Sequence, residues 1–344
     1  MVGDHVDLQN QSALFKPLLI GNTQIDNRIA VSAMCTYAAD PQSHTITKSQ
    51  LDHYISLAKQ QPGLIVFENM SVSDLAIANK CDLALWNDEQ AKELAPLIDE
   101  IHELDVKCCI QLTHPGRKSI VECFAPTSIP FDKDSLLPVE LSSRQIEQII
   151  KDFVNAARRA VTICHVDYIE ISCCNGNLLH QFLSRQTNQR QDCYGSEDIG
   201  KRGLFLIEMI KAIRKEMDIP IFVKLAACDN LKEGESIEDT LQLCHCLTDI
   251  VDLIDITSGG ISPDSKSRWL LNQDKSIPGQ VPLAEKVKNK IGNRCIVGCS
   301  GGLNRNIKEL EFFVKSGKFD IAFIGKGFIE TAQLMQQIIT QVSS

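Results

Sequence analysis

Long apolar runs, zinc-type cysteine spacing and an excess of positive charge are all missing from this sequence. No stretch approaches the ~18 apolar residues of a membrane-spanning helix, and the N-terminal MVGDHVDLQNQS has neither the basic nor the apolar region of a secretory signal. The 35 Lys and Arg are outnumbered by 44 Asp and Glu, which gives a net charge of −9. Since phosphate recognition needs a basic face, we expect neither a nucleic-acid partner nor an anionic membrane partner. We also predict a cytoplasmic protein, because no secretory signal is visible.

The 14 cysteines lack the pattern of a metal site or a disulfide framework. No Cys-x-x-Cys occurs, and no Cys/His set has zinc spacing. Pairs such as Cys108 and Cys109 lie inside apolar runs, where neighbouring side chains face opposite sides of a strand. We interpret most of the cysteines as small buried hydrophobes in a reducing compartment, and we predict no metal.

The composition is that of an ordinary globular chain. Hydrophobic residues make up 44% and charged residues 23% of the 344 positions, which excludes intrinsic disorder as the main state. At ~150 residues per domain the length allows two domains, but α/β barrels often exceed about 200 residues as one domain. The order of the secondary-structure elements therefore decides between them.

Eight short apolar, β-branched runs predict eight strands, at residues 28–34, 63–70, 107–113, 167–173, 220–226, 252–258, 294–299 and 320–325. Near-continuous apolar character is typical of parallel strands that are covered on both faces. Helical patterns lie between and after these runs, at residues 48–60, 88–104, 143–164, 202–217, 236–249, 281–291, 304–316 and 327–341.

Eight strand–helix units favour an α/β fold of the closed (β/α)8 TIM barrel type over a doubly wound open sheet. We expect a single domain over residues 1–344, with an N-terminal cap segment and a long loop, 115–141, after the third strand. A loop of this length is usually functional. The chemistry of such barrels lies at the carboxyl ends of the strands.

Glycine-rich turns follow the last two strands and lead into helices. They contain Gly298, Gly301 and Gly302 after the seventh strand, and Gly325 and Lys326 after the eighth. Glycine lets backbone N–H groups approach an anion, and a helix N-terminus adds its dipole. Either turn alone could be a tight connection and nothing more, but the pair together with a lysine favours a phosphate site.

Three polar residues at other strand ends have several possible roles. Lys224 lies in an apolar run and could be a Schiff-base lysine, a salt-bridge partner or a stabiliser of a bound anion. The Gln111 amide can donate and accept hydrogen bonds at a strand end. It could do so in a functional site or in a structural hydrogen bond of the core or a loop. For His114 a structural hydrogen bond is favoured, because no second metal ligand is placed beside it.

Several colinear motifs resemble one family over residues 14–328. They are LFKPLLIGNTQIDNRIAVSAMCTYAAD, GLIVFENMSVS, CIQLTHPGRKS, IEISCCNGNLLHQFLS, the set Asn188, Arg190, Asp192, Tyr194 and Gly195, VDLIDITSGG and PGQVPLAEKV. In this order they resemble the old yellow enzyme family of FMN-dependent NAD(P)H oxidoreductases, in its bacterial cysteine-containing branch.

The resemblance implies FMN at the carboxyl end of the barrel, reduced by NAD(P)H, with ping-pong hydride transfer to a small electrophilic acceptor such as an activated alkene. It implies that Lys224 stabilises negative charge on the flavin, in place of the family's arginine. It also implies that the glycines and Lys326 hold the phosphate. The residues implied to lie around the flavin ring are Ala33, Met34, Cys35, Asn69 and Gln111.

The residues implied to activate the acceptor depart from the family's pattern. Ser172 stands where the family has His, and Asn175 is an accepted form of its partner. Asn177 replaces the proton-donating tyrosine, and an amide does not donate a proton at a useful pKa. We therefore expect weak reduction of ordinary enones, with Tyr37 as a possible pocket hydroxyl and Cys35 near the reactive edge.

Two further functions stay open beside alkene reduction: reduction of quinones or nitro compounds with the same flavin, and a non-catalytic barrel that binds FMN or has lost it. The segment 327–344 contains no Arg or Lys. The resemblance therefore does not support the dimer in which part of this branch shares an arginine between subunits, although another homo-oligomer is possible.

Overall fold

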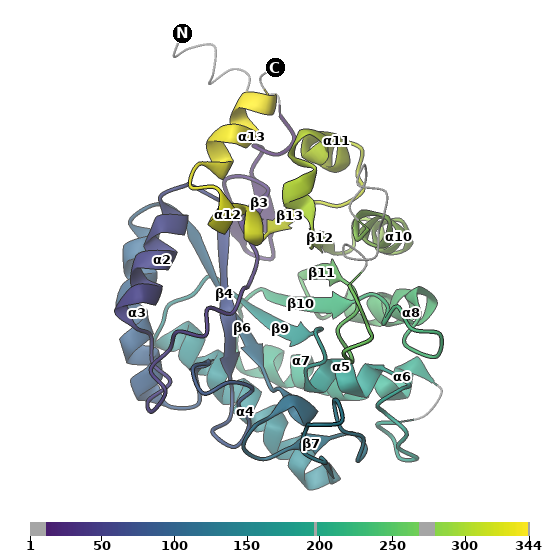
Figure 1. Cartoon of the computed structure of the whole chain (residues 1–344). Coiled ribbons are helices and arrows are strands. Elements are labelled where there is room, and N and C mark those ends of the chain that lie inside the picture. The colour runs from purple at the N-terminus through teal and green to yellow at the C-terminus, as the bar shows by residue number, and fades with distance from the viewer. Residues whose placement is uncertain (1–11, 196–197, 268–278, 343–344) are drawn as a thin grey trace.

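Eight parallel strands close into a barrel in the computed structural model, which describes residues 12–195, 198–267 and 279–342 (Figure 1). The strands are β3 (Ile29–Val31), β4 (Leu64–Ser71), β6 (Lys107–Thr113), β9 (Tyr168–Cys173), β10 (Ile221–Ala226), β11 (Leu253–Thr257), β12 (Ile296–Ser300) and β13 (Ile321–Ile324). Neighbours pair in parallel, and β3 pairs with both β13 and β4, which closes the sheet. All eight predicted strands and the predicted fold class are confirmed.

Helices surround the strands, as Figure 1 shows for α2 and α3 on the left and α8 and α10 on the right. Six predicted helices are confirmed: α2 (Lys48–Ala58), α3 (Asp88–His102), α4 (Ser143–Thr162), α7 (Leu204–Glu216), α8 (Ile237–Leu247) and α10 (Val281–Ile291). Two short helices, α5 (Leu178–Leu183) and α6 (Ile199–Arg202), were not predicted.

The last two predicted helices are not continuous, so these two predictions were wrong. Segment 304–316 holds the 3-10 turns η2 (Leu303–Arg305) and η3 (Ile307–Glu309) and then α11 (Leu310–Lys315), because Asn306 has a non-helical φ of −131°. Segment 327–341 divides at Thr331, whose backbone is extended, into α12 (Lys326–Glu330) and α13 (Leu334–Val342). Asn and Thr are weak helix formers, and periodicity alone did not reveal the breaks.

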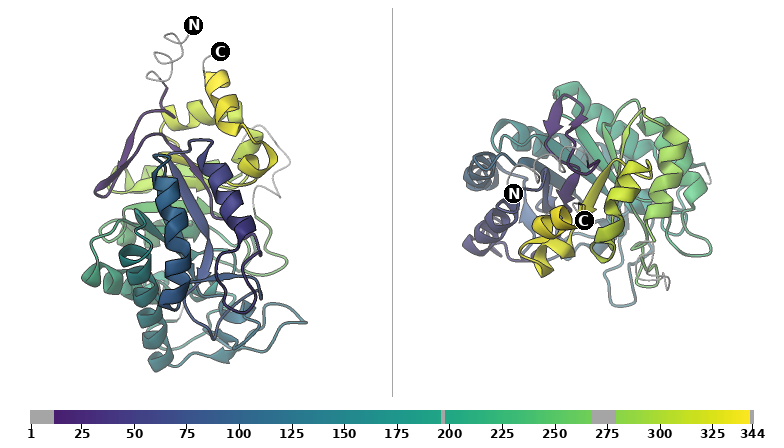
Figure 2. Two further views of the ribbon diagram at one scale, coloured as in Figure 1. Left: turned by 90° about the vertical axis from the view of Figure 1, so that its left-hand side faces the viewer. Right: turned by 90° about the horizontal axis from the view of Figure 1, so that it is seen from above.

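The predicted N-terminal segment is a hairpin of β1 (Leu18–Ile20) and β2 (Thr23–Ile25), purple in Figure 2. Its side chains Leu18, Ile20 and Ile25 pack into the apolar cluster inside the barrel, so it covers the amino ends of the strands. Residues 1–11 of the predicted segment, and the first residue of the PGQVPLAEKV motif, lie outside the described part.

The predicted long loop 115–141 contains short elements: η1 (Gly116–Lys118), β7 (Phe124–Ala125) and β8 (Val139–Glu140). Arg117 is 3% exposed and anchors the loop. Its guanidinium donates to the carbonyls of Ile129, Pro130 and Ile261, at 3.3, 3.1 and 2.5 Å.

Alternation along the strands separates an outer and an inner cluster. Cys108 packs outward against the helices, and Cys109 packs inward with Tyr168 and Phe222, as expected for neighbours on a strand. Toward the carboxyl ends the inward side chains become polar. We call this set the inner polar layer: Ser32, Asn69, Gln111, Glu170, Lys224, Asp255 and Ser300. The layer lies on the inner apolar cluster, which we call the apolar plug: Leu18, Ile20, Ile25, Ala30, Leu64, Val66, Cys109, Tyr168, Phe222, Leu253, Ile321 and Phe323. The plug separates the layer from the solvent at the amino end of the barrel.

All 14 cysteines are free, and nine of them are buried, in agreement with the interpretation as small core residues. In the described ranges, no helix is both long and apolar enough to cross a lipid bilayer. The same ranges contain no group of three or more His, Cys, Asp or Glu that could hold a metal ion.

The apolar plug should carry much of the stability. Phe222 is 0% exposed and its ring centroid lies 4.8 Å from that of Tyr168. We expect Phe222→Ala to lower the free energy of unfolding by about 3–5 kcal/mol, because it opens a cavity that the surrounding strands cannot close. Urea unfolding followed by circular dichroism measures this.

The matched control is Phe312→Ala, which removes a ring that is 60% exposed and should change the unfolding free energy by less than about 1 kcal/mol. Equal losses in the two variants would contradict the role of the plug.

Candidate functional site

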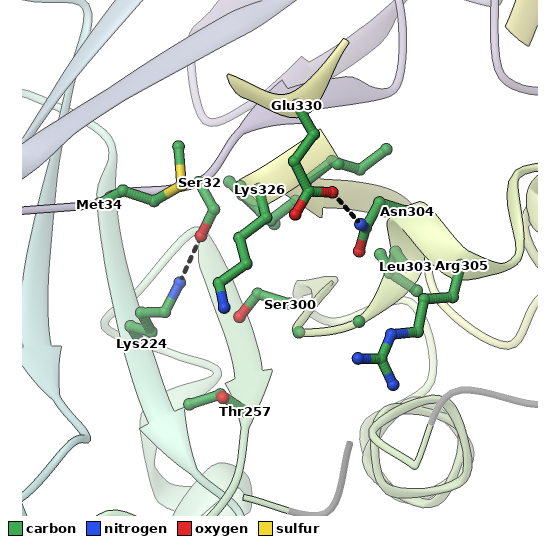
Figure 3. Close-up of a pocket in the computed structure, with 15 residues that line it drawn as sticks. Ser32, Met34, Lys224, Thr257, Ser300, Leu303, Asn304, Arg305, Lys326 and Glu330 are labelled. Atoms are coloured by element: carbon green, nitrogen blue, oxygen red, sulfur yellow. Dashed lines mark hydrogen bonds between the residues drawn. The ribbon is translucent and has the colours of Figure 1, made fainter. Parts of the chain in front are cut away.

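A cavity of about 490 Å³ opens at the carboxyl ends of the barrel strands (Figure 3). Its walls come from β3, β10, β11, β12 and β13 and from the turns after β12 and β13. The lining residues are Ser32, Met34, Lys224, Thr257, Ser300, Gly301, Gly302, Leu303, Asn304, Arg305, Phe323, Ile324, Gly325, Lys326 and Glu330. Six of these were predicted from the sequence: Met34, Lys224, Gly301, Gly302, Gly325 and Lys326.

Lys224 is the buried cation of the inner polar layer. Its Nζ lies 2.6 Å from Asp255 Oδ2 and donates to Ser32 Oγ at 3.0 Å. Asp255 is its register partner on β11. Burial by itself lowers the pKa of Lys224, but the carboxylates of Asp255 and Glu170 outweigh burial and hold the pKa above its usual range. The ion pair with Asp255 therefore favours the charged amine, whereas a Schiff-base role needs a neutral nucleophile.

Cationic side chains and the backbone of glycine residues line the outer end of the cavity. Gly301 and Gly302 have φ of +114° and +77°, and a Cβ on Gly325 would lie 2.7 Å from Met34 Sδ. In Figure 3 the Lys326 side chain points into the space between Lys224 and Arg305. Among the described residues of the wall, Glu330 is the one carboxylate, and it accepts from Asn304 Nδ2 at 3.1 Å.

A β-bulge in β4 changes the directions of two adjacent polar residues, Glu68 and Asn69. The pairing with β6 joins Phe67 to Ile110 and Asn69 to Gln111, so Glu68 has no register partner. Glu68 turns toward α2 and accepts from Thr36 N at 2.9 Å, Thr36 Oγ1 at 2.7 Å, Gln50 Nε2 at 3.1 Å and Tyr54 OH at 3.2 Å. This carboxylate fixes the segment after β3, and with it Cys35.

Cys35, Tyr37 and Asn69 lie together beside the inner polar layer. Asn69 Nδ2 donates to Cys35 Sγ at 3.6 Å. Burial raises the pKa of the Cys35 thiol, and the nearby carboxylates of Glu68 and Asp82 raise it further. The proximity of Cys35, together with burial, raises the pKa of Tyr37 to about 12, although its side chain is 55% exposed.

Ser172, Asn175 and Asn177 lie at the end of β9 and in the turn that follows. Ser172 is the register partner of Lys224, and its hydroxyl accepts from Asn177 Nδ2 at 2.9 Å. Asn175 has φ of +55°, and its carbonyl accepts from Lys118 Nζ at 3.0 Å. The two side chains that depart from the family's pattern therefore satisfy each other.

The remaining predicted residues do not line the cavity. Ala33, Cys35, Asn69 and Gln111 lie beside it, and a Cβ on Gly298 would lie 2.4 Å from the Phe323 ring. His114 is buried, and burial lowers its pKa to about 3. Its Nδ1 accepts from Gly116 N at 3.0 Å, which is the structural role expected from the sequence.

The sequence prediction missed several polar residues of this region: Ser32, Glu68, Lys118, Glu170, Asp255, Ser300 and Arg305. For two of them a signal was present, because Glu170 and Asp255 interrupt apolar strand runs just as Lys224 does. For Glu68 the bulge gave no signal, since its geometry depends on the pairing of β4 with β6.

Comparison with known proteins gives a family match over nearly the whole chain. The model of the NADH:flavin oxidoreductase / NADH oxidase family matches residues 13–344. An NADPH dehydrogenase of Listeria monocytogenes serotype 4a (strain HCC23) is 34% identical over 336 residues, which are 96% of this chain and 95% of that protein. The NADPH dehydrogenase of Bacillus subtilis (strain 168) is 34% identical over 318 residues, 91% of this chain and 90% of that protein.

Solved structures share the fold at lower identity. A 2-naphthoyl-CoA reductase in complex with 2-naphthoyl-CoA has a TM-score of 0.87 at 24% identity, covering 95% of this chain. The chain spans about half of that reductase, 52% of its length. The old yellow enzyme from Trypanosoma cruzi has a TM-score of 0.81 at 19% identity, covering 95% of this chain and 91% of its own.

The Cys35 thiol should react slowly at neutral pH. A thiol pKa raised by one unit leaves about tenfold less thiolate. We therefore expect iodoacetamide to alkylate Cys35 more slowly than the exposed Cys246 at about pH 7.5, with a rate that still rises above pH 9. Peptide mass spectrometry after timed quenching measures both rates in one sample.

Cys246 is the internal reference in that sample. A Cys35 rate that equals the Cys246 rate and levels off below pH 8 would contradict the raised pKa.

Proposed function

The chain belongs to the NADH:flavin oxidoreductase / NADH oxidase family and is an FMN-dependent NAD(P)H oxidoreductase of old yellow enzyme type, and we propose that it reduces a small electrophilic acceptor at the inner polar layer. The observation that carries this proposal is one continuous site: a cationic, glycine-lined cavity that ends at the charged Lys224. We propose ping-pong use of this site, in which NAD(P)H leaves before the acceptor enters.

The residues present fit FMN. In the described part of the chain, the cavity wall contains three cations, Lys224, Arg305 and Lys326, and one carboxylate, that of Glu330. Ser300 Oγ is buried in this wall and has no hydrogen-bond partner among the described residues. A hydroxyl left unsatisfied costs free energy unless a ligand pairs with it. The glycines with positive φ leave backbone N–H groups accessible to a phosphate.

Each part of the site has its own task in this proposal. Gly301, Gly302, Arg305, Lys326 and Ser300 hold the phosphate of FMN. FMN, when bound, would supply the hydride-transfer chemistry, and the protein supplies orientation and charge.

At the ring end, Lys224 stabilises negative charge on the pyrimidine side, where Gln111 adds a hydrogen bond. Ala33, Met34 and Cys35 back the ring, with Asn69 beside them. Cys35 at this position supports the assignment of the chain to the cysteine-containing branch of the family.

The acceptor side favours molecules that need no proton donor. The Ser172 hydroxyl and the Asn177 amide are bonded to each other, and neither is an acid at neutral pH. Tyr37, with its pKa raised to about 12, is a weaker acid than an ordinary tyrosine. Activated alkenes need a proton at the α-carbon, whereas quinones and nitro compounds take electrons without a dedicated donor. We therefore propose quinones or nitro compounds as a second acceptor class beside activated alkenes.

Lys326→Ala should weaken FMN binding. The loss of a charge-assisted hydrogen bond costs about 1.5–3 kcal/mol, which corresponds to a roughly 10- to 150-fold higher Kd. Fluorescence titration of FMN-depleted protein measures the Kd. Lys315→Ala, which removes an exposed lysine of α11 outside the cavity, should leave the Kd unchanged, so equal effects of the two substitutions would reject the phosphate role.

Purified protein should be yellow, and its colour should bleach with NAD(P)H in the absence of oxygen. Anaerobic reoxidation of the bleached protein by a quinone should be faster than by cyclohexenone, because the acceptor side lacks an acid. Stopped-flow absorbance measures both rates. Faster reoxidation by the enone would favour activated alkenes, and colourless protein that FMN does not reconstitute would overturn the flavin proposal itself.

A further inference from the structure

Glu170 is a fully buried carboxyl in the inner polar layer that the reaction described above does not use. It is 0% exposed and lies in register with Gln111 on the neighbouring strand. Gln111 donates its side-chain amide to Glu170 Oε2. The other oxygen, Oε1, is buried and has no hydrogen-bond partner among the described residues.

The charges around Glu170 do not balance. On β10 and β11, Lys224 and Asp255 form an ion pair of 2.6 Å. The titratable groups nearby on β6 and after β9 are the thiols of Cys109 and Cys174, and burial raises the pKa of both, to about 12 for Cys174. The thiols are therefore neutral at physiological pH. One cation then faces two carboxylates, so the layer has a net charge of −1 when Glu170 is ionised.

An excess charge in a dry interior is costly, and a buried group reduces that cost by changing its protonation state. Burial raises the pKa of Glu170, the charge of Lys224 opposes that rise, and the balance lies at about 7. A second negative charge close by would raise this pKa further.

We propose that Glu170 is a positioning residue that compensates charge: it is ionised while the cofactor site is oxidised and takes up a proton at Oε1 when the site is reduced. This inference rests on the proposed function, because FMN supplies the change in charge. Gln111, which bonds Glu170 and is proposed to contact the cofactor, links the two.

Hydride donation by NAD(P)H brings two electrons and one proton into the site, which leaves one additional negative charge there. One proton from solvent forms an O–H bond on Glu170 and neutralises that charge. When the acceptor removes the hydride, the Glu170 proton returns to solvent.

The test is the pH dependence of the reduction potential of the FMN-loaded protein, followed by spectroelectrochemical titration from about pH 5.5 to 9.5. At a pH below the Glu170 pKa of the oxidised protein, Glu170 is protonated in both redox states, so we expect one proton for two electrons. Above that pH Glu170 is ionised only in the oxidised state, and we expect two protons for two electrons until the pKa of the reduced state is passed.

Glu170→Gln keeps the shape and a hydrogen bond to Gln111 but cannot titrate, so we expect one proton for two electrons at every pH. Glu235→Gln is the matched control, a buried carboxyl with a pKa also raised by burial but paired with Arg202 of α6, and it should keep the wild-type profile. A purely structural role of Glu170 would give the same profile in all three proteins.

Three outcomes would overturn the proposal: a one-proton dependence throughout in the wild type, a two-proton dependence that persists in Glu170→Gln, or loss of the two-proton range in Glu235→Gln. If Glu170→Gln does not fold, infrared difference spectra of wild-type protein with 13C-labelled glutamate should show a protonated carboxyl appearing on reduction above pH 7. Its absence would also overturn the proposal. Protein that binds no FMN contradicts the proposed function instead, and is recognised by its lack of colour.

Discussion

The pairing of Lys224 with Asp255 is the constraint on which the site depends. An ammonium group inside a barrel is stable only if something negative faces it, and Asp255 does so from the adjacent strand at 2.6 Å. The apolar plug beneath excludes water, and this strengthens the pair while raising the cost of leaving either partner alone. The cavity therefore holds the Lys224 ammonium group in one place at its inner end, where Ser32 Oγ accepts a second hydrogen bond from it.

The second constraint is a local irregularity of the sheet. In a regular strand Glu68 would point into the barrel and Asn69 away from it. The bulge in β4 instead turns Glu68 outward, where it holds the backbone of Thr36, and brings Asn69 into register with Gln111. One extra residue thus supplies both a support for the segment that carries Cys35 and a polar side chain beside it.

The acceptor side shows how two substitutions can compensate each other. A serine in place of histidine and an asparagine in place of tyrosine would each leave an unsatisfied polar group in a buried turn. Together they form a hydrogen bond of 2.9 Å, so the turn is stable without the acid that the family's pattern provides. We propose that the chemistry changes while the fold of the barrel stays intact, because the turn adds side chains to a scaffold that the strands determine.

The eight strands, the order of the units and the residues of the glycine turns could be predicted from the sequence, because apolar, β-branched runs and glycine are local signals. The sequence also singled out Lys224, as a charge that interrupts an apolar run. The partners of each charge could not be predicted in this way, since Asp255 and Glu170 are distant in sequence and come together through strand register. The outward turn of Glu68 and the breaks at Asn306 and Thr331 likewise depend on pairing and packing between distant segments, which the spacing of residues along one chain does not encode.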